Sequence, residues 1–170
     1  MTTYSDTILS VTTSGLTTFG MTLIAFICRG NTCRSPLAEA LARRSFADVA
    51  RPVTVASAGV AVDRPGAPAD PRAVAAGARY GLDLTSHRAA ALTVDLVASA
   101  DFLIALDQRT QSEILARYGT DTCRVPLLMS FQPNAGGPDV ADPYYGTDED
   151  YARALNLISA GIDGLVRSLR

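Results

Sequence analysis

Short apolar runs separated by polar, glycine-rich turns dominate the pattern of this chain. The runs at 23–27, 53–56 and 102–106 have the length of strands, and the first and third are continuously apolar. A shorter fourth run covers 125–128, where Pro126 favours a sheet edge or a strand end. Continuous apolar runs of this length are typical of strands that are buried on both faces. We therefore predict four strands, of which the first and third are buried on both faces.

Helical spacing follows the predicted strands. Pro36 suits the first turn of a helix to about residue 47, Asp70 caps a helix that Gly81 ends, and Asp107 caps a third to about 118. Apolar positions four and three apart predict a last, amphipathic helix over 151–169. Strands alternating with helices predict an α/β fold in three layers, a four-stranded parallel sheet flanked by helices.

The first twenty residues differ from the rest of the chain. They hold seven threonines and three serines, with no basic residue and no apolar run. A polar segment of this kind has little apolar surface to bury, so we predict a disordered tail over 1–20 and one domain over 21–170.

Composition narrows the classes of protein that fit. A net charge of −2 gives no indication of a nucleic-acid partner, and no segment approaches the roughly 20 apolar residues that span a membrane. Three cysteines in 170 residues do not form a disulfide framework and fit a reducing compartment. We therefore expect a cytoplasmic protein.

Residues 28–35 form the segment with the clearest chemistry, Cys28-Arg29-Gly30-Asn31-Thr32-Cys33-Arg34-Ser35. This segment joins the carboxyl end of the first strand to the amino end of the first helix, where open α/β sheets bind ligands. Its backbone N–H groups and those of the helix can form a cradle for an anion. Gly30 and Asn31 are residue types that tolerate the positive φ angles of such a cradle. The sequence therefore predicts a phosphate loop.

Cys28 and Arg34 supply the reactive groups of this loop. A ring of N–H groups favours the thiolate form of Cys28, and Ser35 is placed to donate a hydrogen bond to the same sulfur. The planar guanidinium of Arg34 can hold two oxygens of a phosphoryl group. These groups need no metal or cofactor, so we expect none, and we expect a phosphate or sulfate ion to bind in the cradle.

At these residues the chain resembles the low-molecular-weight protein tyrosine phosphatases. The resemblance covers about residues 22–170, and its motifs are the loop with Pro36, Ala38-Glu39-Ala40, Ser57-Ala58-Gly59, Ser86-His87-Arg88, Ala100-Asp101 through Asp107, and Asp142-Pro143-Tyr144-Tyr145. It implies a four-stranded parallel sheet, with Cys28 as nucleophile, Arg34 as phosphate ligand and Asp142 as general acid. One carboxyl group can protonate the leaving oxygen and then activate water, which suits Asp142 in a glycine-flanked loop.

The resemblance also implies supporting roles. His87, the sole histidine, would help to hold Asn31 and the loop rather than act as a base, and Ser57 would belong to the same hydrogen-bond network. Cys33 would form a protective disulfide with Cys28 on oxidation, or else be a small packed thiol; both alternatives remain open. Cys123 is expected to be an inert thiol.

Two residues bear on the substrate. Tyr144 and Tyr145 are expected at the rim, where they would stack on an aromatic substrate or else pack against the last helix. A deep cradle with aromatic neighbours favours phosphotyrosine. Thr32 instead resembles the protein-arginine phosphatases of the same fold, which usually have a smaller residue in place of Tyr145.

Two further classes fit the sequence less well. Arsenate reductases of this fold need resolving cysteines after Leu84, and residues 85–92 contain none. A module that only binds phosphotyrosine would usually lack Cys28 or Asp142. The sequence therefore predicts a metal-independent cysteine phosphatase, a monomer or weak dimer, that acts on phosphorylated proteins, with no nucleic-acid or membrane partner.

Overall fold

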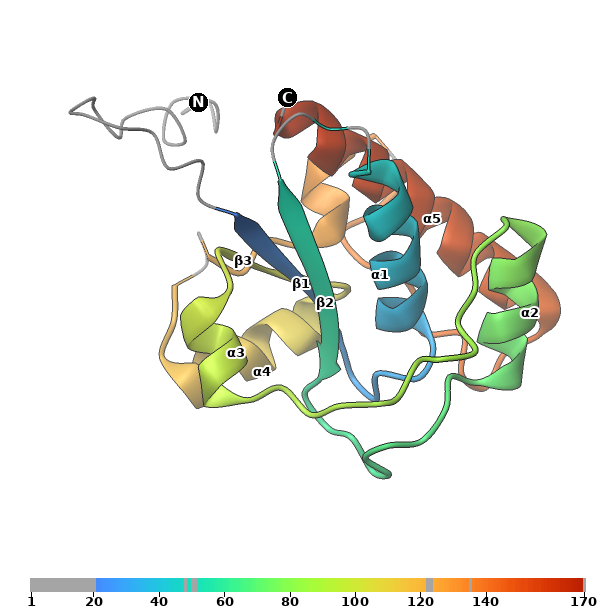
Figure 1. The fold of residues 1–170 in the computed structure, drawn as a ribbon, viewed down its shortest axis with the longest axis horizontal. Coiled ribbons are helices and arrows are strands. Elements are labelled where there is room, and N and C mark those ends of the chain that lie inside the picture. Colours follow the sequence, from blue (N-terminus) through green and yellow to red (C-terminus); the bar gives the residue numbers. More distant parts are fainter. Residues whose placement is uncertain (1–20, 48, 50–51, 122–123, 135, 170) are drawn as a thin grey trace.

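The computed structural model describes residues 21–169 apart from 48, 50–51, 122–123 and 135 (Figure 1). The predicted tail over 1–20 and the thiol of Cys123 lie outside these residues. In chain order the elements are β1 (Thr22–Cys28), α1 (Arg34–Ser45), β2 (Val53–Gly59), α2 (Pro71–Arg79), α3 (Val94–Ser99), β3 (Phe102–Ala105), α4 (Gln108–Tyr118), the 3-10 helix η1 (Leu128–Phe131) and α5 (Asp148–Ser168).

The sheet is parallel, with strand order β2-β1-β3. The first strand, β1, lies in the middle, and Ile24, Ala25, Phe26 and Ile27 are fully buried. A strand with a neighbour on each edge and helices on each face has no solvated side, which explains its continuous apolar sequence. The predicted parallel α/β architecture is confirmed.

The prediction of a fourth strand was wrong for the described residues. The segment at 125–128 follows the edge of β3, where Leu103 N–H donates to Arg124 O and Ala105 N–H donates to Pro126 O. Only an isolated bridge between Ala105 and Leu127 results. Pro126 has no N–H to donate to the ladder, and η1 begins directly after Leu127, so the pairing ends there.

Two apolar cores lie on the two faces of the sheet. In Figure 1, α1, α2 and α5 lie on one face and α3 and α4 on the other. Ile24 and Phe26 point into the first core, whereas Ala25 and Ile27 point into the second, as the period of two along a strand requires. The three-layer prediction is therefore confirmed. None of the described helices combines the length and the apolar character that crossing a bilayer requires.

The helix caps follow the sequence prediction, whereas two short elements do not. Asp70 accepts a hydrogen bond from Arg72 N–H at the start of α2, and Asp107 accepts one from Thr110 N–H at the start of α4.

The sequence analysis predicted neither α3 nor η1. In η1, the carbonyl of Phe131 comes so close to α5 that a Cβ at Gly164 would lie 2.1 Å from it, so this contact requires glycine.

Candidate active site

The phosphate loop, residues 28–35, begins at the carboxyl end of the central strand and leads directly into α1. Gly59 of β2 pairs with Cys28 beneath this loop. A Cβ at Gly59 would lie 2.6 Å from the Arg29 carbonyl oxygen and 3.0 Å from Asn31 N. The loop can therefore fold back over β2 only because residue 59 has no side chain.

The Cys28 sulfur lies inside the loop and is held by two hydrogen-bonding groups. Asn31 N–H donates to Cys28 Sγ at 3.3 Å, and Ser35 Oγ lies 3.0 Å from the sulfur. The Asn31 amide donates to Ser35 Oγ at 2.9 Å, so the Ser35 hydroxyl can donate in turn, to the sulfur or to the Ala58 carbonyl oxygen 3.4 Å away. Both groups lie where they can donate a hydrogen bond to the sulfur.

Asn31 fixes the shape of the phosphate loop. It is fully buried and has φ 53°, and Gly30 does not share this left-handed conformation. Its Nδ2 also donates to Ser57 Oγ at 2.9 Å, and its Oδ1 accepts from Ala90 N at 2.8 Å. His87 Nε2 donates to the Asn31 carbonyl at 2.8 Å. The structure therefore places His87 and Ser57 around Asn31, away from the Cys28 sulfur.

The first turn of α1 leaves its N–H groups available to an anion. No side chain caps this turn, and it contains no acidic residue. Free N–H groups and the positive end of the helix dipole attract an anion at this position. Arg29, which is exposed, and Gly30 line the same cleft.

Arg34 is held by three oxygen atoms from two other segments. Its Nη1 donates to Asp107 Oδ2 at 2.5 Å and to the Val140 carbonyl at 2.9 Å, and its Nη2 donates to Asp142 Oδ2 at 2.9 Å. Burial would lower the pKa of Arg34, but the negative charges of Cys28, Asp142 and Asp107 outweigh burial and raise it. Arg34 therefore stays charged and fixed in direction.

Asp142 lies on the acid loop, which we define as residues 139–147. Its side chain is 42% exposed, in contrast to 3% for the Arg34 side chain. Besides the ion pair with Arg34, Asp142 Oδ1 accepts a hydrogen bond from Tyr144 N at 3.2 Å. The carboxylate is therefore turned toward the phosphate loop by the acid loop's own backbone and by Arg34.

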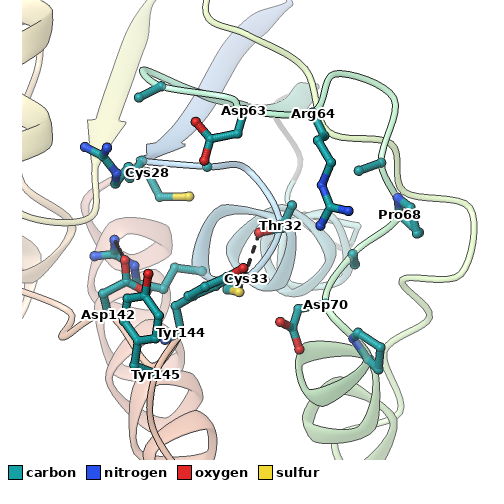
Figure 2. Close-up of a pocket in the computed structure, with 17 residues that line it drawn as sticks. Cys28, Thr32, Cys33, Asp63, Arg64, Pro68, Asp70, Asp142, Tyr144 and Tyr145 are labelled. Carbon is teal, nitrogen blue, oxygen red and sulfur yellow. Dashed lines mark hydrogen bonds and ion pairs between the residues drawn. The ribbon is translucent and has the colours of Figure 1, made fainter.

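A cleft of about 380 Å³ opens above the phosphate loop. Figure 2 shows the Cys28 sulfur at its base, Asp142, Tyr144 and Tyr145 on one side, and Asp63, Arg64, Pro68 and Asp70 on the other. The two tyrosine rings meet edge to face, with centroids 4.9 Å apart. Tyr145 is 96% exposed, so it belongs to the rim of the cleft rather than to the packing of α5.

Cys33 has a different environment from Cys28. Its Sγ lies 3.3 Å from the Tyr151 hydroxyl and 3.6 Å from Thr32 Oγ1. Burial raises the pKa of Cys33 to about 11, so the residue is a neutral thiol at neutral pH. Both Cys28 and Cys33 are free thiols in this structure.

Sequence reasoning missed several residues of the site. Asp107 was expected only to cap α4, yet its second oxygen holds Arg34. Glu39 accepts a hydrogen bond from Ser57 at 2.5 Å and so extends the network around Asn31. The position of Asp107 directly after β3 was a usable signal, because carboxyl ends of parallel strands meet at one edge of the sheet.

These features define a class of protein. A cysteine sulfur lies at the base of a loop of backbone N–H groups, an arginine closes this loop, and a carboxylate faces both. This set is suited to phosphoryl transfer through a covalent cysteine intermediate. Within the part of the chain that the structure describes, no three His, Cys, Asp or Glu side chains gather as metal ligands would.

Comparisons with known proteins agree with this class. Residues 23–170 match the family model described as low molecular weight phosphotyrosine protein phosphatase. The chain therefore belongs to this family. A relative from Ralstonia nicotianae, named probable low molecular weight protein-tyrosine-phosphatase EpsP, is 38% identical over 147 residues, which cover 86% of this chain and 95% of the relative.

Two further relatives bear on fold and substrate. The crystal structure of a low molecular weight protein tyrosine phosphatase from T. tengcongensis has a TM-score of 0.78 and 30% identity, covering 86% of this chain and 98% of that chain. A protein-arginine-phosphatase from Bacillus subtilis is 33% identical over 147 residues, covering 86% of this chain and 96% of the relative. Similarity of sequence therefore extends to relatives named for two different substrates.

Proposed function

We propose that this chain is a protein-tyrosine phosphatase that hydrolyses phosphotyrosine through a phosphocysteine intermediate. The observation that carries the proposal is the geometry of the phosphate loop, which has Cys28 Sγ at one end and Arg34 at the other. Asp142, from the acid loop, pairs with Arg34 at 2.9 Å. Names of the relatives and of the family support the same reaction. We propose Cys28 as nucleophile, Arg34 as phosphate ligand and Asp142 as general acid and base.

Substrate binding would use the whole phosphate loop. The phosphoryl dianion would accept hydrogen bonds from backbone N–H groups of residues 29–35 and from the guanidinium of Arg34. Asp107 and the Val140 carbonyl hold Nη1 of Arg34, so the arginine has little freedom left to lose when the anion binds. Nη2, which donates to Asp142 in this structure, would donate to a phosphoryl oxygen instead.

The first chemical step would transfer the phosphoryl group to sulfur. The Cys28 thiolate attacks phosphorus, an S–P bond forms, and the P–O bond to the phenol breaks. The electron pair of that bond stays on the phenolic oxygen, which takes the proton of the Asp142 carboxylic acid. Asp142 can reach this oxygen because its partly exposed side chain lies on the open side of the cleft.

The second step would release phosphate. A water molecule attacks phosphorus, the Asp142 carboxylate takes its proton, and the S–P bond breaks with its electrons returning to Cys28. Ser35 Oγ at 3.0 Å and Asn31 N at 3.3 Å stabilise the sulfur anion as it leaves. No electron acceptor or donor is needed, and the products are the phenol and inorganic phosphate.

The walls of the cleft favour a flat aromatic ester. Cys28 lies at the base, whereas Tyr144 and Tyr145 form one side higher up, so a long side chain is needed to reach the sulfur. An aromatic ring between the walls would contact Tyr144, and a protein substrate would contact Tyr145. We propose phosphotyrosine-containing proteins as substrates in the cytoplasm, inorganic phosphate as a competing ligand, and a monomer or weak dimer as the working form.

Phosphoarginine is the second candidate substrate. Thr32 lines the cleft, where a hydroxyl suits a phosphoguanidinium group better than an aliphatic side chain does. The Bacillus subtilis relative named protein-arginine-phosphatase supports this alternative. Against it, the exposed ring of Tyr145 occupies the rim.

Turnover of p-nitrophenyl phosphate without added metal tests the proposed reaction. We expect activity in the presence of a chelator, and a loss of at least about 10⁴-fold in Cys28→Ser, because the hydroxyl is a far weaker nucleophile than the thiolate. Circular dichroism of the variant controls for folding. Substantial turnover by a folded Cys28→Ser variant would show that the nucleophile is another group.

Two peptides with the same sequence, one with phosphotyrosine and one with phosphoarginine, decide between the substrates. We expect a higher kcat/KM for phosphotyrosine, and we expect Thr32→Ile to raise the ratio of tyrosine to arginine activity further. A preference for the phosphoarginine peptide would reverse the assignment of substrate. An unchanged ratio in Thr32→Ile would mean that Thr32 does not determine it.

A further inference from the structure

Arg72, in the first turn of α2, joins three segments around the cleft without lining it. Its Nε and Nη2 donate to the two oxygens of Asp70 at 3.0 and 2.9 Å, and its Nη1 donates to the Gly146 carbonyl of the acid loop at 3.3 Å. Its guanidinium carbon lies 5.8 Å from the ring centroid of Tyr144 and 5.0 Å from that of Tyr151. One side chain thus contacts Asp70 at the start of α2, the acid loop and Tyr151 of α5.

Asp70, the carboxylate partner of Arg72, is hydrogen-bonded to the phosphate loop. Asp70 N–H donates to the Thr32 carbonyl at 2.9 Å, and the Asp70 side chain is 11% exposed. Hydrogen bonds from Arg72 lower the pKa of Asp70, against the opposing effect of burial. The pair is therefore charged at neutral pH, and Arg72 has a fixed position relative to the phosphate loop.

The other end of Arg72 reaches the segment that orients Asp142. Tyr144 N–H donates to Asp142 Oδ1, and Gly146 N–H donates to the Pro143 carbonyl at 2.8 Å in the same turn. Arg72 therefore holds the turn through the Gly146 carbonyl and through the face of the Tyr144 ring. A shift of this turn would carry the Asp142 carboxylate away from its place beside Arg34.

We propose that Arg72 is a positioning residue for the general acid, which fixes the acid loop so that Asp142 faces the leaving oxygen. The inference rests on the proposed function, because it needs Asp142 to be the proton donor. Arg72 would touch neither the substrate nor the reacting atoms. Its loss would weaken proton transfer and would leave the binding of the phosphoryl group to the phosphate loop intact.

A series of aryl phosphates with phenols of different acidity separates this role from a general loss of structure. The value of kcat/KM reports the first chemical step, which needs the proton only when the phenol is a poor leaving group. For Arg72→Gln we expect about a tenfold fall in kcat/KM with phenyl phosphate and less than about twofold with 2,4-dinitrophenyl phosphate. Arg72→Lys keeps the charge but not the planar guanidinium. Its kcat/KM with phenyl phosphate should lie between those of wild type and Arg72→Gln.

Arg79→Gln is the matched control on the same helix. Arg79 is 63% exposed, and among the described residues its one ion pair is with Asp148 at 3.9 Å. Its loss should therefore leave kcat/KM unchanged for every ester of the series. A second test combines Arg72→Gln with Asp142→Ala. If Arg72 acts through Asp142, the double variant should have the same kcat/KM on each ester as Asp142→Ala alone.

The outcomes divide cleanly. A loss that grows as the phenol becomes less acidic, and that disappears in the Asp142→Ala background, supports the proposal. An equal loss on every ester, a loss that persists without Asp142, or no loss in either Arg72 variant overturns it. If Asp142→Ala alone showed no dependence on the leaving group, the proposed general acid would be wrong, and the role of Arg72 would fall with it.

Discussion

The phosphate loop and the acid loop face each other across one cleft, yet they are built in opposite ways. In the phosphate loop Asn31 and Ser35 are fully buried and Arg34 is 2% exposed. In the acid loop the Asp142 side chain is 42% exposed and Tyr145 is 96% exposed. Hydrogen bonds within the phosphate loop and between Asn31 and its neighbours Ser57 and Ala90 hold the first loop in place. The second loop is attached by Leu106 and Gln108 at residues 139–140, and by Arg34 and Arg72 at Asp142 and Gly146.

This difference follows from what each loop has to do. Charge that develops on a phosphoryl group is stabilised best by donors that are already in place, so rigidity in the phosphate loop lowers the barrier. The acid loop has to admit a substrate and a water molecule, then give and take a proton, so it needs an open side. Attachment through arginine side chains fixes the direction of Asp142 while leaving that side open.

Asn31→Ala tests the rigidity of the phosphate loop and should have the largest effect of the three substitutions. The substitution removes the side-chain hydrogen bonds to Ser35, Ser57 and Ala90 and leaves a non-glycine residue at φ 53°. We expect the free energy of unfolding to fall by about 2–4 kcal/mol and kcat by about 100-fold or more. Urea unfolding and the p-nitrophenyl phosphate assay measure the two quantities.

The control for this substitution is Asn134→Ala, at an exposed position outside both loops. It should change stability by less than about 0.5 kcal/mol. If Asn31→Ala were as stable and as active as this control, the phosphate loop would not depend on its buried network.

Asp107→Asn tests the link between the two loops through Arg34, with a smaller effect. We expect kcat/KM to fall about tenfold, because the neutral amide holds the guanidinium less firmly. Burial would raise the pKa of Asp107, but the hydrogen bond from Thr110 N–H and the charge of Arg34 lower it on balance. The folded protein therefore keeps this carboxylate ionised at pH values where the unfolded chain takes up a proton.

The sign of the pH dependence follows from that lowered pKa. Stability due to Asp107 is present above the unfolded pKa, about 3.9, and is lost as the pH falls through the lower folded value. The stability gap between wild type and Asp107→Asn should thus be largest near pH 7 and should shrink below about pH 4. Urea unfolding at several pH values gives this gap, and a gap that widened in acid would contradict the assignment.

Tyr145→Ala tests the open half of the comparison and should have the smallest effect. The ring is almost fully exposed and touches Tyr144 edge to face, so its loss should change stability by less than about 0.5 kcal/mol. We expect kcat with p-nitrophenyl phosphate to be unchanged and KM for a phosphotyrosine peptide to rise about twofold to fivefold. An equal fall in kcat/KM for p-nitrophenyl phosphate and for the peptide would mean that Tyr145 acts on the reaction itself and not on the binding of the protein substrate.

The phosphate loop could be predicted from the sequence because its function depends on local order along the chain. A buried strand, a turn with Gly30 and Asn31, and a helix start with Pro36 place Cys28 and Arg34 around one cradle within a few residues of sequence. The caps at Asp70 and Asp107 follow the same local rule, and the structure has both.

Long-range contacts could not be predicted in the same way. Asp107 and Arg34 are 73 positions apart, and Arg72 and Gly146 are 74 apart, so only the folded sheet brings them together. The local signal at Asp107 indicated only a helix cap, and no separate signal indicated a role for Arg72, which lies in the helix that Asp70 caps. The fourth strand failed for a related reason, since an apolar run does not reveal that η1 begins directly after Leu127.

A crystal structure of the protein with vanadate tests the central claim most directly. Vanadate takes the five-coordinate geometry of the phosphoryl group in transfer. The account predicts vanadium bonded to Cys28 Sγ, equatorial oxygens on the backbone N–H groups of residues 29–35 and on Arg34, and the Asp142 carboxyl beside the apical oxygen opposite the sulfur. Vanadate bound elsewhere in the cleft, with the Cys28 sulfur free and the loop N–H groups directed away from it, would contradict the account.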